Sequence, residues 1–282
     1  MNFALTPPAQ SAVAIHGSDA LFPVARIFCV GRNYLDHVKE MGNDPERSPP
    51  IFFMKPATAL VPDGQDVAYP DHTQNLHHEI ELVVAIGKSG SRVQSTVAEE
   101  YVFGYAVGND LTRRDLQKRA READGPWEIA KAFDHSAPIG AIHTVADNGH
   151  VRDGEIAISV NGEIRQQANI NQMIWSVPEI IAELSAMFEL QAGDLIYTGT
   201  PAGVGAVKPG DRMGELSGAL SASTRSKYCL PPRRHFARLK RKIPTRDIWR
   251  NMMSVAYVLC FWQVSDAIQT LCIGPKQSWV FR

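Results

Sequence analysis

Three acidic side chains stand at or beside apolar segments that are predicted to form β-strands. Glu79 and Glu81 begin the segment 79–86, and Asp110 follows the segment 101–107. Residues two apart in a strand lie on the same face, so Glu79 and Glu81 would present two carboxylates side by side. Burial and like-charge repulsion both penalise such a pair, and a divalent cation with oxygen ligands removes both penalties. The pattern predicts a magnesium or manganese site, because zinc more often recruits Cys or His.

The same acids have a simpler interpretation, in which segment 79–86 is an edge strand with its polar face in water. For an isolated Glu-x-Glu motif that interpretation is the commoner one, and Asp110 is what favours a metal site. His77 and His78 are rival ligands. Neighbouring residues in a strand face opposite ways, so His77 shares the face of Glu79 and His78 does not. We interpret both histidines as supporting or purely structural residues.

His37 and Glu40 form a second constellation, spaced three residues apart in a segment with helical periodicity. On one turn of a helix the two side chains are neighbours and can hydrogen-bond. A carboxylate that orients an imidazole makes it a general base able to deprotonate water near neutral pH. A surface pair without a role is the more common occurrence. The turn-rich sequence on either side allows instead a lid that brings the base to the substrate.

Two further features could receive an anion. Lys131 is flanked by apolar residues and could bind a substrate carboxylate or a developing oxyanion, although an ordinary surface lysine would look the same. Segment 197–205 is a glycine-rich turn after a strand, and its backbone N–H groups could bind a carboxylate. It has neither the Lys-Ser/Thr ending of a P-loop nor the spacing of a dinucleotide-binding turn, so nucleotide binding is not expected.

The elements that must position these residues are mostly short strands. Strands are predicted at 11–15, 26–30, 51–54, 79–86, 101–107, 155–160 and 195–198. A brief helix is predicted within 33–41 and an amphipathic helix at 176–188, with Ser176 as its N-cap and Pro178 in its first turn. Many strands and few long helices indicate a strand-rich α+β domain rather than regular βαβ alternation.

Composition excludes several other classes of protein. The chain has 282 residues, 44% hydrophobic residues and a formal charge of −1, which gives no reason to expect nucleic acid or a membrane surface as partner. The densest apolar run, residues 255–262, is far shorter than the roughly 20 residues of a membrane-spanning helix. The start lacks the pattern of a secretory signal. The four cysteines suggest no disulfide framework, and a cytoplasmic location is expected.

Charge divides the chain unevenly. Residues 214–282 carry 12 Lys and Arg against three Asp and Glu, and they hold three of the four cysteines. We therefore expect a peripheral lead-in at 1–23, one metal-dependent domain at 24–213 and an atypical basic tail at 214–282. A frameshift or a fused coding sequence is the preferred explanation of the tail, ahead of a genuine added module.

Seven segments occur in an order typical of one family: GRNYLDHVKEMG (31–42), FFMKP (52–56), NLHHEIELVVAIG (75–87), GYAVGNDLTRRDLQ (104–117), GPWEIAKAFD (125–134), VNGEIRQ (160–166) and LIYTGTPAGVG (195–205). Together they resemble the catalytic domain of the fumarylacetoacetate hydrolase family, especially its acylpyruvate and fumarylpyruvate hydrolase branch. The resemblance implies a roll of twisted mixed β-sheets, assembled as a homodimer. It also implies a closing strand soon after Asp211. The change to a basic segment beyond Met213 departs from that pattern, so the sequence predicts that the closing strand is missing.

The resemblance assigns roles to individual residues. It implies that Glu79, Glu81 and Asp110 hold Mg²⁺ or Mn²⁺, that His37 and Glu40 activate water, and that Lys131 is the active-site lysine. It further implies that the substrate pocket is lined by Arg32, Tyr34, Gln117 and Thr200.

The implied reaction is hydrolysis of a small 2-oxo acid. The substrate is a 2,4-dioxo acid, and the bond between C3 and C4 is cleaved. Fumarylpyruvate, which would yield fumarate and pyruvate in aromatic catabolism, is the leading substrate. Oxaloacetate decarboxylation and 2-hydroxydienoate isomerisation would use the same site, and an intact His37–Glu40 pair favours hydrolysis over them. An inactive binding protein, or the product of a disrupted gene, is the alternative of a different class.

Overall fold

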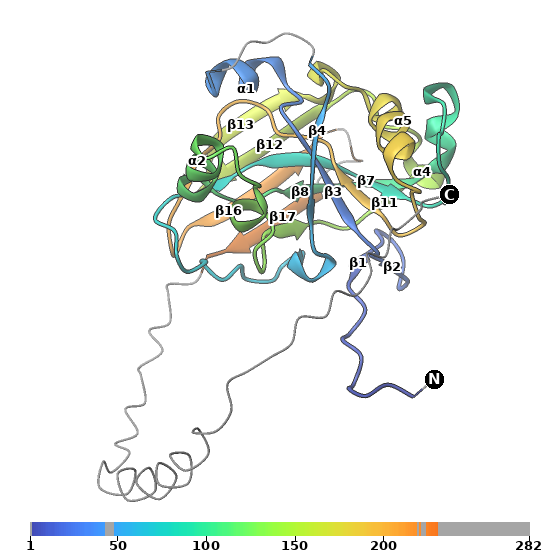
Figure 1. Cartoon of the computed structure of the whole chain (residues 1–282), viewed down its shortest axis with the longest axis horizontal. Coiled ribbons are helices and arrows are strands. Elements are labelled where there is room, and N and C mark those ends of the chain that lie inside the picture. The colour runs from blue at the N-terminus through green and yellow to red at the C-terminus, as the bar shows by residue number, and fades with distance from the viewer. Residues whose placement is uncertain (1, 43–47, 219, 221–223, 231–282) are drawn as a thin grey trace, which may run out of the picture. The chain divides into compact units, whose positions relative to one another are not determined.

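One sheet of eight strands crosses the middle of the domain (Figure 1). The computed structural model describes residues 2–42, 48–218, 220 and 224–230. The strands of this sheet are β3 (Ile27–Gly31), β4 (Ile51–Lys55), β5 (Leu60–Pro62), β7 (Ile80–Ile86), β8 (Val102–Asn109), β10 (Ala137–Ile139), β11 (His143–Thr144) and β14 (Leu195–Tyr197). Their order is β4-β3-β14-β7-β8-β10-β5, and β11 also pairs with β8. Because β14 runs parallel to β3 and antiparallel to β7, the sheet is mixed, as the sequence predicted.

Both faces of the central strand β7 are buried, which explains why its residues are apolar apart from Glu81. Alternate side chains of β7 enter two separate hydrophobic clusters: Leu82 and Val84 lie in one, and Val83 and Ala85 lie in the other. All seven residues of β7 are buried. A strand between two neighbours, covered on both faces, has no polar edge in water. The edge-strand interpretation of segment 79–86 is therefore wrong.

Helix α5 (Val177–Met187) covers one face of the sheet, at the right of Figure 1. Its side chains Val177, Ile180, Ile181 and Leu184 recur at helical spacing and join the first cluster. The helix begins at Ser176, whose backbone N–H donates to the Glu179 carboxylate at 2.9 Å in a capping box. The predicted start and course of this helix are confirmed.

Three smaller sheets complete the strand inventory. They contain β1 (Ala12–Ala14) and β2 (Leu21–Pro23); β6 (Leu76–His78), β9 (Thr112–Arg113) and β15 (Gly205–Val207); and β12 (Glu155–Val160), β13 (Glu163–Asn169), β16 (Arg212–Ser217) and β17 (Thr224–Cys229). The remaining elements are helices α1 (Leu35–Glu40), α2 (Arg114–Glu122), α3 (Glu128–Lys131) and α4 (Val145–Asn148) and the 3₁₀ turns η1 (Ala57–Ala59), η2 (Ser95–Tyr101) and η3 (Ile170–Gln172). None of the helices among the described residues is long and apolar enough to cross a membrane.

Two sequence-based boundaries differ from the structure. The lead-in at 1–23 contributes β1 and β2, whose Val13 and Phe22 are buried in the second cluster. The boundary expected at residue 213 falls inside β16, which pairs with β12, and β17 then pairs with β16 up to Cys229. The closing strands are therefore present despite the basic composition of this segment. The rest of the predicted tail, residues 231–282, lies outside the described residues.

Candidate active site

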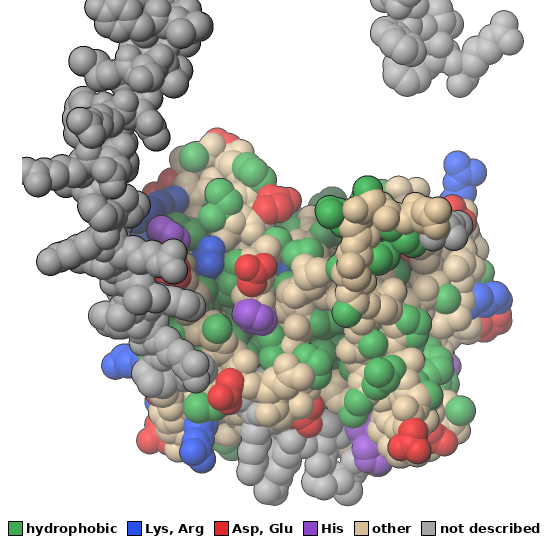
Figure 2. Space-filling model, turned by 90° about the horizontal axis from the view of Figure 1, so that it is seen from below, with side chains coloured by type: hydrophobic (Ala, Val, Ile, Leu, Met, Phe, Trp, Pro, Cys, Tyr) green, Lys and Arg blue, Asp and Glu red, His purple; other side chains and the backbone are tan. Residues whose placement is uncertain are grey.

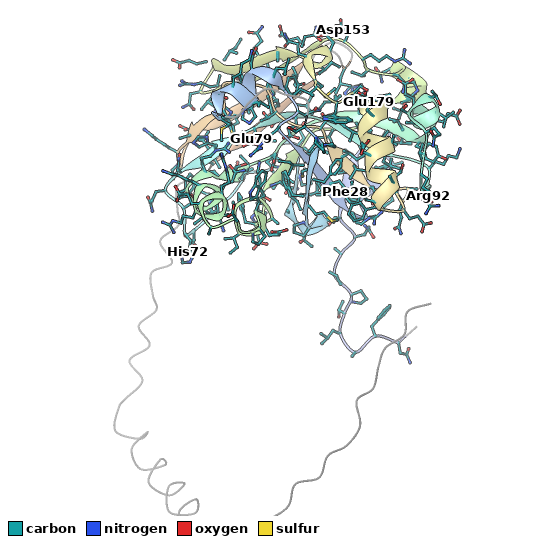
Figure 3. The ribbon with its side chains drawn as sticks, turned by 45° about the horizontal axis from the view of Figure 1, so that its top comes forward. Phe28, His72, Glu79, Arg92, Asp153 and Glu179 are labelled. Atoms are coloured by element: carbon teal, nitrogen blue, oxygen red, sulfur yellow. The ribbon has the colours of Figure 1, made fainter. Side chains whose placement is uncertain are left out.

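Glu79, Glu81 and Asp110 converge inside the domain. One carboxylate oxygen from each lies within 4.8 Å of the others, and all three residues are buried. In Figure 3 Glu79 lies within the outline of the fold, whereas His72, Arg92 and Asp153 mark its margin. Glu79 occupies the break between β6 and β7, and its backbone N–H donates to the Asn109 side chain at 2.9 Å. The backbone N–H of Asp110 donates to the Glu79 carbonyl at 2.8 Å, which locks the ends of β7 and β8 together.

Three protein cations neutralise part of this cluster. The Lys131 ammonium bonds to Glu79 at 2.7 Å and also to Asp110, the Lys55 ammonium lies 2.8 Å from Asp110, and the Arg114 guanidinium pairs with Glu79. Burial would raise the pKa of Glu79, but Lys131 and Arg114 outweigh it and hold that pKa well below its usual range. A divalent ion would therefore not be the only positive charge beside these acids, because protein cations also contact them.

Glu81 is the acid of the three that no protein cation contacts within the described residues. It makes no ion pair with any residue in the described part of the chain, and its one hydrogen bond accepts the Gly199 backbone N–H at 2.8 Å. Burial raises the pKa of Glu81 well above its usual range, and the neighbouring Asp110 adds to the effect. Three converging carboxylates, one of them without a counter-ion, fit the oxygen-rich ligand set of Mg²⁺ or Mn²⁺.

His37 and Glu40 pair on one turn of α1, as their spacing predicted. His37 Nδ1 lies 3.1 Å from the Glu40 carboxylate, and His37 is buried while its ring lines the cleft above the acids. Glu40 is fixed in turn by the Gly203 backbone N–H, which donates to both carboxylate oxygens at 3.1 and 3.2 Å. The carboxylate therefore occupies one ring nitrogen and leaves Nε2 available for proton transfer.

The glycine-rich turn holds protein carboxylates. We expected its N–H groups to receive a substrate carboxylate, but Gly199 donates to Glu81 and Gly203 donates to Glu40. Gly199 has φ +99, and a Cβ there would lie 2.6 Å from Cβ of Asn33. Only glycine fits such a position, because of both the left-handed backbone and the close approach. The turn positions two site residues at once.

The two histidines before Glu79 support the site without joining the acid cluster. His77 lies 3.3 Å from Arg114 Nε and 2.9 Å from the Asn75 side chain, and burial together with Arg114 lowers the pKa of His77 to about 4. His78 bonds to Gln166 at 2.8 Å, and burial lowers its pKa. Both rings are thus held neutral by their surroundings, which agrees with a supporting role.

Four residues were expected in the substrate pocket. Arg32, Gln117 and Thr200 line the cleft, which has a volume of about 470 Å³ and also contains the three acids, His37 and Lys131. Gln117 accepts from Arg114, and Thr200 accepts from Gln166 at 2.8 Å. Tyr34 is buried beside this cleft but does not line it. Burial raises the pKa of its hydroxyl, and Glu81 adds to the shift.

Sequence analysis assigned no role to Lys55, Arg114 or Arg121. Lys55 ends β4 in the motif FFMKP, and both arginines lie on α2, a helix that the sequence did not predict. Arg114, Gln117 and Arg121 line the cleft together. Their spacing of three and four residues would have placed them on one helical face, had the helix been recognised.

A strand-rich domain with a buried acid triad, adjoining cations and a carboxylate-held imidazole defines a class of enzyme that acts on small anionic substrates. Comparison with known proteins narrows that class. Residues 26–223 match the family model described as fumarylacetoacetate (FAA) hydrolase C-terminal. The chain therefore belongs to the fumarylacetoacetate hydrolase family, and it is an enzyme of the hydrolase class that acts on carbon–carbon bonds.

Relatives of this chain carry two different activities in their names. Oxaloacetate tautomerase FAHD1 of Rattus norvegicus is 44% identical over 209 residues, covering 72% of this chain and 93% of the rat protein. Fumarylpyruvate hydrolase of Ralstonia sp is 47% identical over 174 residues, covering 61% of this chain and 90% of that protein. The crystal structure of fumarylpyruvate hydrolase from Pseudomonas aeruginosa in complex with Mn²⁺ and pyruvate has a TM-score of 0.79 and 52% identity, covering 82% of this chain and all of that one.

Proposed function

We propose that this chain is a Mg²⁺- or Mn²⁺-dependent hydrolase that cleaves an acylpyruvate, with fumarylpyruvate as its substrate and fumarate and pyruvate as its products. The observation that carries the proposal is the position of His37, held by Glu40, in the same cleft as the three converging acids. A general base is required for attack by water, and the acids supply the ligand set for a divalent ion. The Mn²⁺ in the Pseudomonas aeruginosa structure supports the choice of metal.

Glu79, Glu81 and Asp110 would hold the metal. When bound, it would supply a Lewis acid that orients the 1-carboxylate and 2-oxo group and favours negative charge on the 2-oxo oxygen. His37 Nε2 takes a proton from water while Glu40 steadies Nδ1, and the water oxygen adds to the C4 carbonyl. The C3–C4 bond then breaks, its electron pair leaves with pyruvate as the enolate, and a proton is added at C3.

Lys131 contributes a fixed positive charge to this step. Burial would lower its pKa, but Asp110 and Glu79 outweigh burial and raise it, so the ammonium stays charged within the cleft. A buried cation beside the developing enolate stabilises it more than a solvated one, because the local dielectric is low. Lys55 anchors this lysine, since its ammonium donates to the Lys131 carbonyl.

Chemistry on oxaloacetate is the second candidate. The rat protein named oxaloacetate tautomerase FAHD1 supports it, because its identity extends over 93% of that protein. Tautomerisation moves a proton at C3 and needs a base but no attacking water. Oxaloacetate decarboxylation and 2-hydroxydienoate isomerisation would use the same three acids, Glu79, Glu81 and Asp110.

The deciding experiment is a substrate panel on the purified full chain with Mg²⁺, with Mn²⁺ and after chelation. We expect metal-dependent loss of the ultraviolet absorbance of fumarylpyruvate, with equal amounts of fumarate and pyruvate. Enol-oxaloacetate that loses its absorbance without pyruvate formation would report tautomerisation. Rapid turnover of oxaloacetate with no cleavage of any acylpyruvate would overturn the proposal, and failure to act on either would favour a binding protein.

Three properties of the whole protein belong to the same proposal. A homodimer is inferred from the family resemblance, and a place in aromatic catabolism follows from the choice of fumarylpyruvate. A cytoplasmic location is inferred from cysteine usage, since Cys29 is the single cysteine before residue 214. Charges of both signs are interspersed over the face in Figure 2, which supports a small acid rather than nucleic acid as the partner.

A further inference from the structure

The cleft has cations at its mouth that the proposed chemistry does not use. Arg32 and Arg121 both line the cleft, and both are exposed. Neither guanidinium makes an ion pair with a residue in the described ranges. Arg114 differs, because its guanidinium forms an ion pair with Glu79. An arginine that has no acid partner and faces a substrate cleft is suited to bind a carboxylate, because its planar donors match the two oxygens.

Arg32 is held in place by a strained turn. Its φ is +61, a left-handed conformation that is unfavourable for a residue other than glycine. The next residue fixes this turn: the Asn33 side chain donates to the carbonyls of Thr198 and Trp175 at 2.7 and 3.0 Å and accepts the Trp175 N–H at 2.7 Å. Strain that the surroundings maintain so firmly indicates a functional position. The turn keeps Arg32 at the cleft.

Arg121 reaches the cleft from the other side. On α2 it follows Gln117 by four residues and Arg114 by seven, and these three residues line the cleft as one helical face. Seven residues of α-helix advance about 10 Å, so this face leads from the acid cluster, which Arg114 contacts, toward the mouth. The guanidinium of Arg121 also lies near that of Arg32: burial lowers the pKa of Arg32, and Arg121 lowers it further. A bound anion would relieve that repulsion.

We propose that Arg32 and Arg121 form a carboxylate-binding subsite at the mouth of the cleft, and that it selects acylpyruvates whose acyl group ends in a carboxylate. The inference rests on the proposed function, since it assumes that the 2-oxo acid end lies at the three acids. Family resemblance placed Arg32 in the pocket without a ligand group, and it gave no role to Arg121. The two carboxylates of a seven-carbon dioxo diacid lie roughly 7 Å apart at bond lengths of about 1.5 Å, so a distal carboxylate lies well away from the 2-oxo acid end. In four-carbon oxaloacetate the two carboxylates lie much closer together.

The test compares fumarylpyruvate, which has a distal carboxylate, with acetylpyruvate, which has none. Arg32→Gln and Arg121→Gln are assayed on both substrates beside the native enzyme, and we expect each to lower the ratio of the two kcat/KM values about tenfold, mainly through a higher KM for fumarylpyruvate. Arg121→Lys should recover part of the ratio. The matched control is Arg119→Gln, on the same helix but outside the cleft, which should leave the ratio unchanged.

The possible outcomes test the proposed subsite and the proposed reaction separately. If both arginine variants lose activity equally on the two substrates, or keep the native ratio, the subsite is refuted while the proposed hydrolase stands. If the native enzyme cleaves neither acylpyruvate, the proposed function fails and the subsite fails with it. Circular dichroism and thermal melting of each variant distinguish a misfolded protein, and a variant that melts early is replaced by the corresponding Lys substitution.

Discussion

The acid cluster of Glu79, Glu81 and Asp110 and the single acid Glu215 on β16 are equally buried, yet their surroundings differ. Lysine and arginine side chains contact the cluster, and its oxygens converge. Around Glu215, burial raises the pKa well above its usual range; the Asn109 side chain opposes this only in part, and Asp63 adds to it. Burial alone therefore does not indicate function. Converging oxygens with charged partners distinguish the cluster from an isolated acid that the fold merely encloses.

The largest effect is expected when the cluster itself is broken. Glu81→Ala removes the acid that has no protein counter-ion, so we expect loss of metal binding and a fall in kcat of at least about 1000-fold. His37→Ala should lower kcat by about 10²–10⁴-fold and leave metal affinity nearly unchanged, because His37 acts as a base and not as a ligand. Calorimetric titration with Mn²⁺, together with the fumarylpyruvate assay, measures both quantities. Full activity in either variant contradicts the assignment.

A second prediction concerns competition between Lys131 and the metal. Lys131→Met leaves Glu79 and Asp110 without a shared partner, and breaking a buried pair in this way costs about 3–5 kcal/mol of stability. Metal should replace part of the lost charge, so Mn²⁺ should raise the Tm of the variant more than that of the native enzyme. Thermal melting with and without Mn²⁺ tests this. An equal rise in both proteins would show that the ion and the lysine do not share these acids.

Most strands and the three acids could be predicted from the sequence for a local reason. The alternation of β7 side chains between two faces, and the position of Asp110 after β8, depend on nearby residues, so Glu81 and Asp110 could be placed from the chain itself. The helical spacing of His37 and Glu40 is equally local, and both residues were found.

The protein cations could not be found in the same way. Lys55 meets Asp110 across 55 positions of sequence, and no local pattern encodes that approach. Helix α2 was missed because its segment is mostly charged, without an apolar stripe. Its first turn is fixed instead by Asp115, which accepts from the Thr73 hydroxyl at 2.6 Å and the Gln74 N–H at 3.0 Å. Strands β16 and β17 were missed for a different reason: residues 214–282 were interpreted as one basic segment, although ten of its 12 Lys and Arg lie beyond residue 230.

A smaller effect, on stability, is expected at Gly199, whose backbone N–H donates to Glu81. Gly199→Ala places a methyl group 2.6 Å from Cβ of Asn33 at φ +99, so we expect a loss of about 1–3 kcal/mol of stability. The Glu81 contact should loosen as well, since Gly199 donates its N–H to that carboxylate. Urea unfolding measures the stability. Gly149→Ala, also at positive φ but in open space, is the control for backbone strain alone. Equal losses would show that packing against Asn33 contributes nothing.

Substitution of Glu215 is expected to change stability by a similar amount with the opposite sign. A carboxyl whose pKa is raised on folding binds its proton more tightly in the native state, so the native protein loses stability as pH rises from the unfolded value toward the folded one. Glu215→Gln keeps the shape and removes the ionisation. We therefore expect the variant to be more stable than the native chain by about 1–3 kcal/mol at pH 8, and by much less at pH 5. Urea unfolding at both pH values provides the measurement, with Glu163→Gln as an exposed control. A variant less stable than the native chain at pH 8 would mean that Glu215 is ionised and partnered in the fold, which would remove the contrast with the acid cluster.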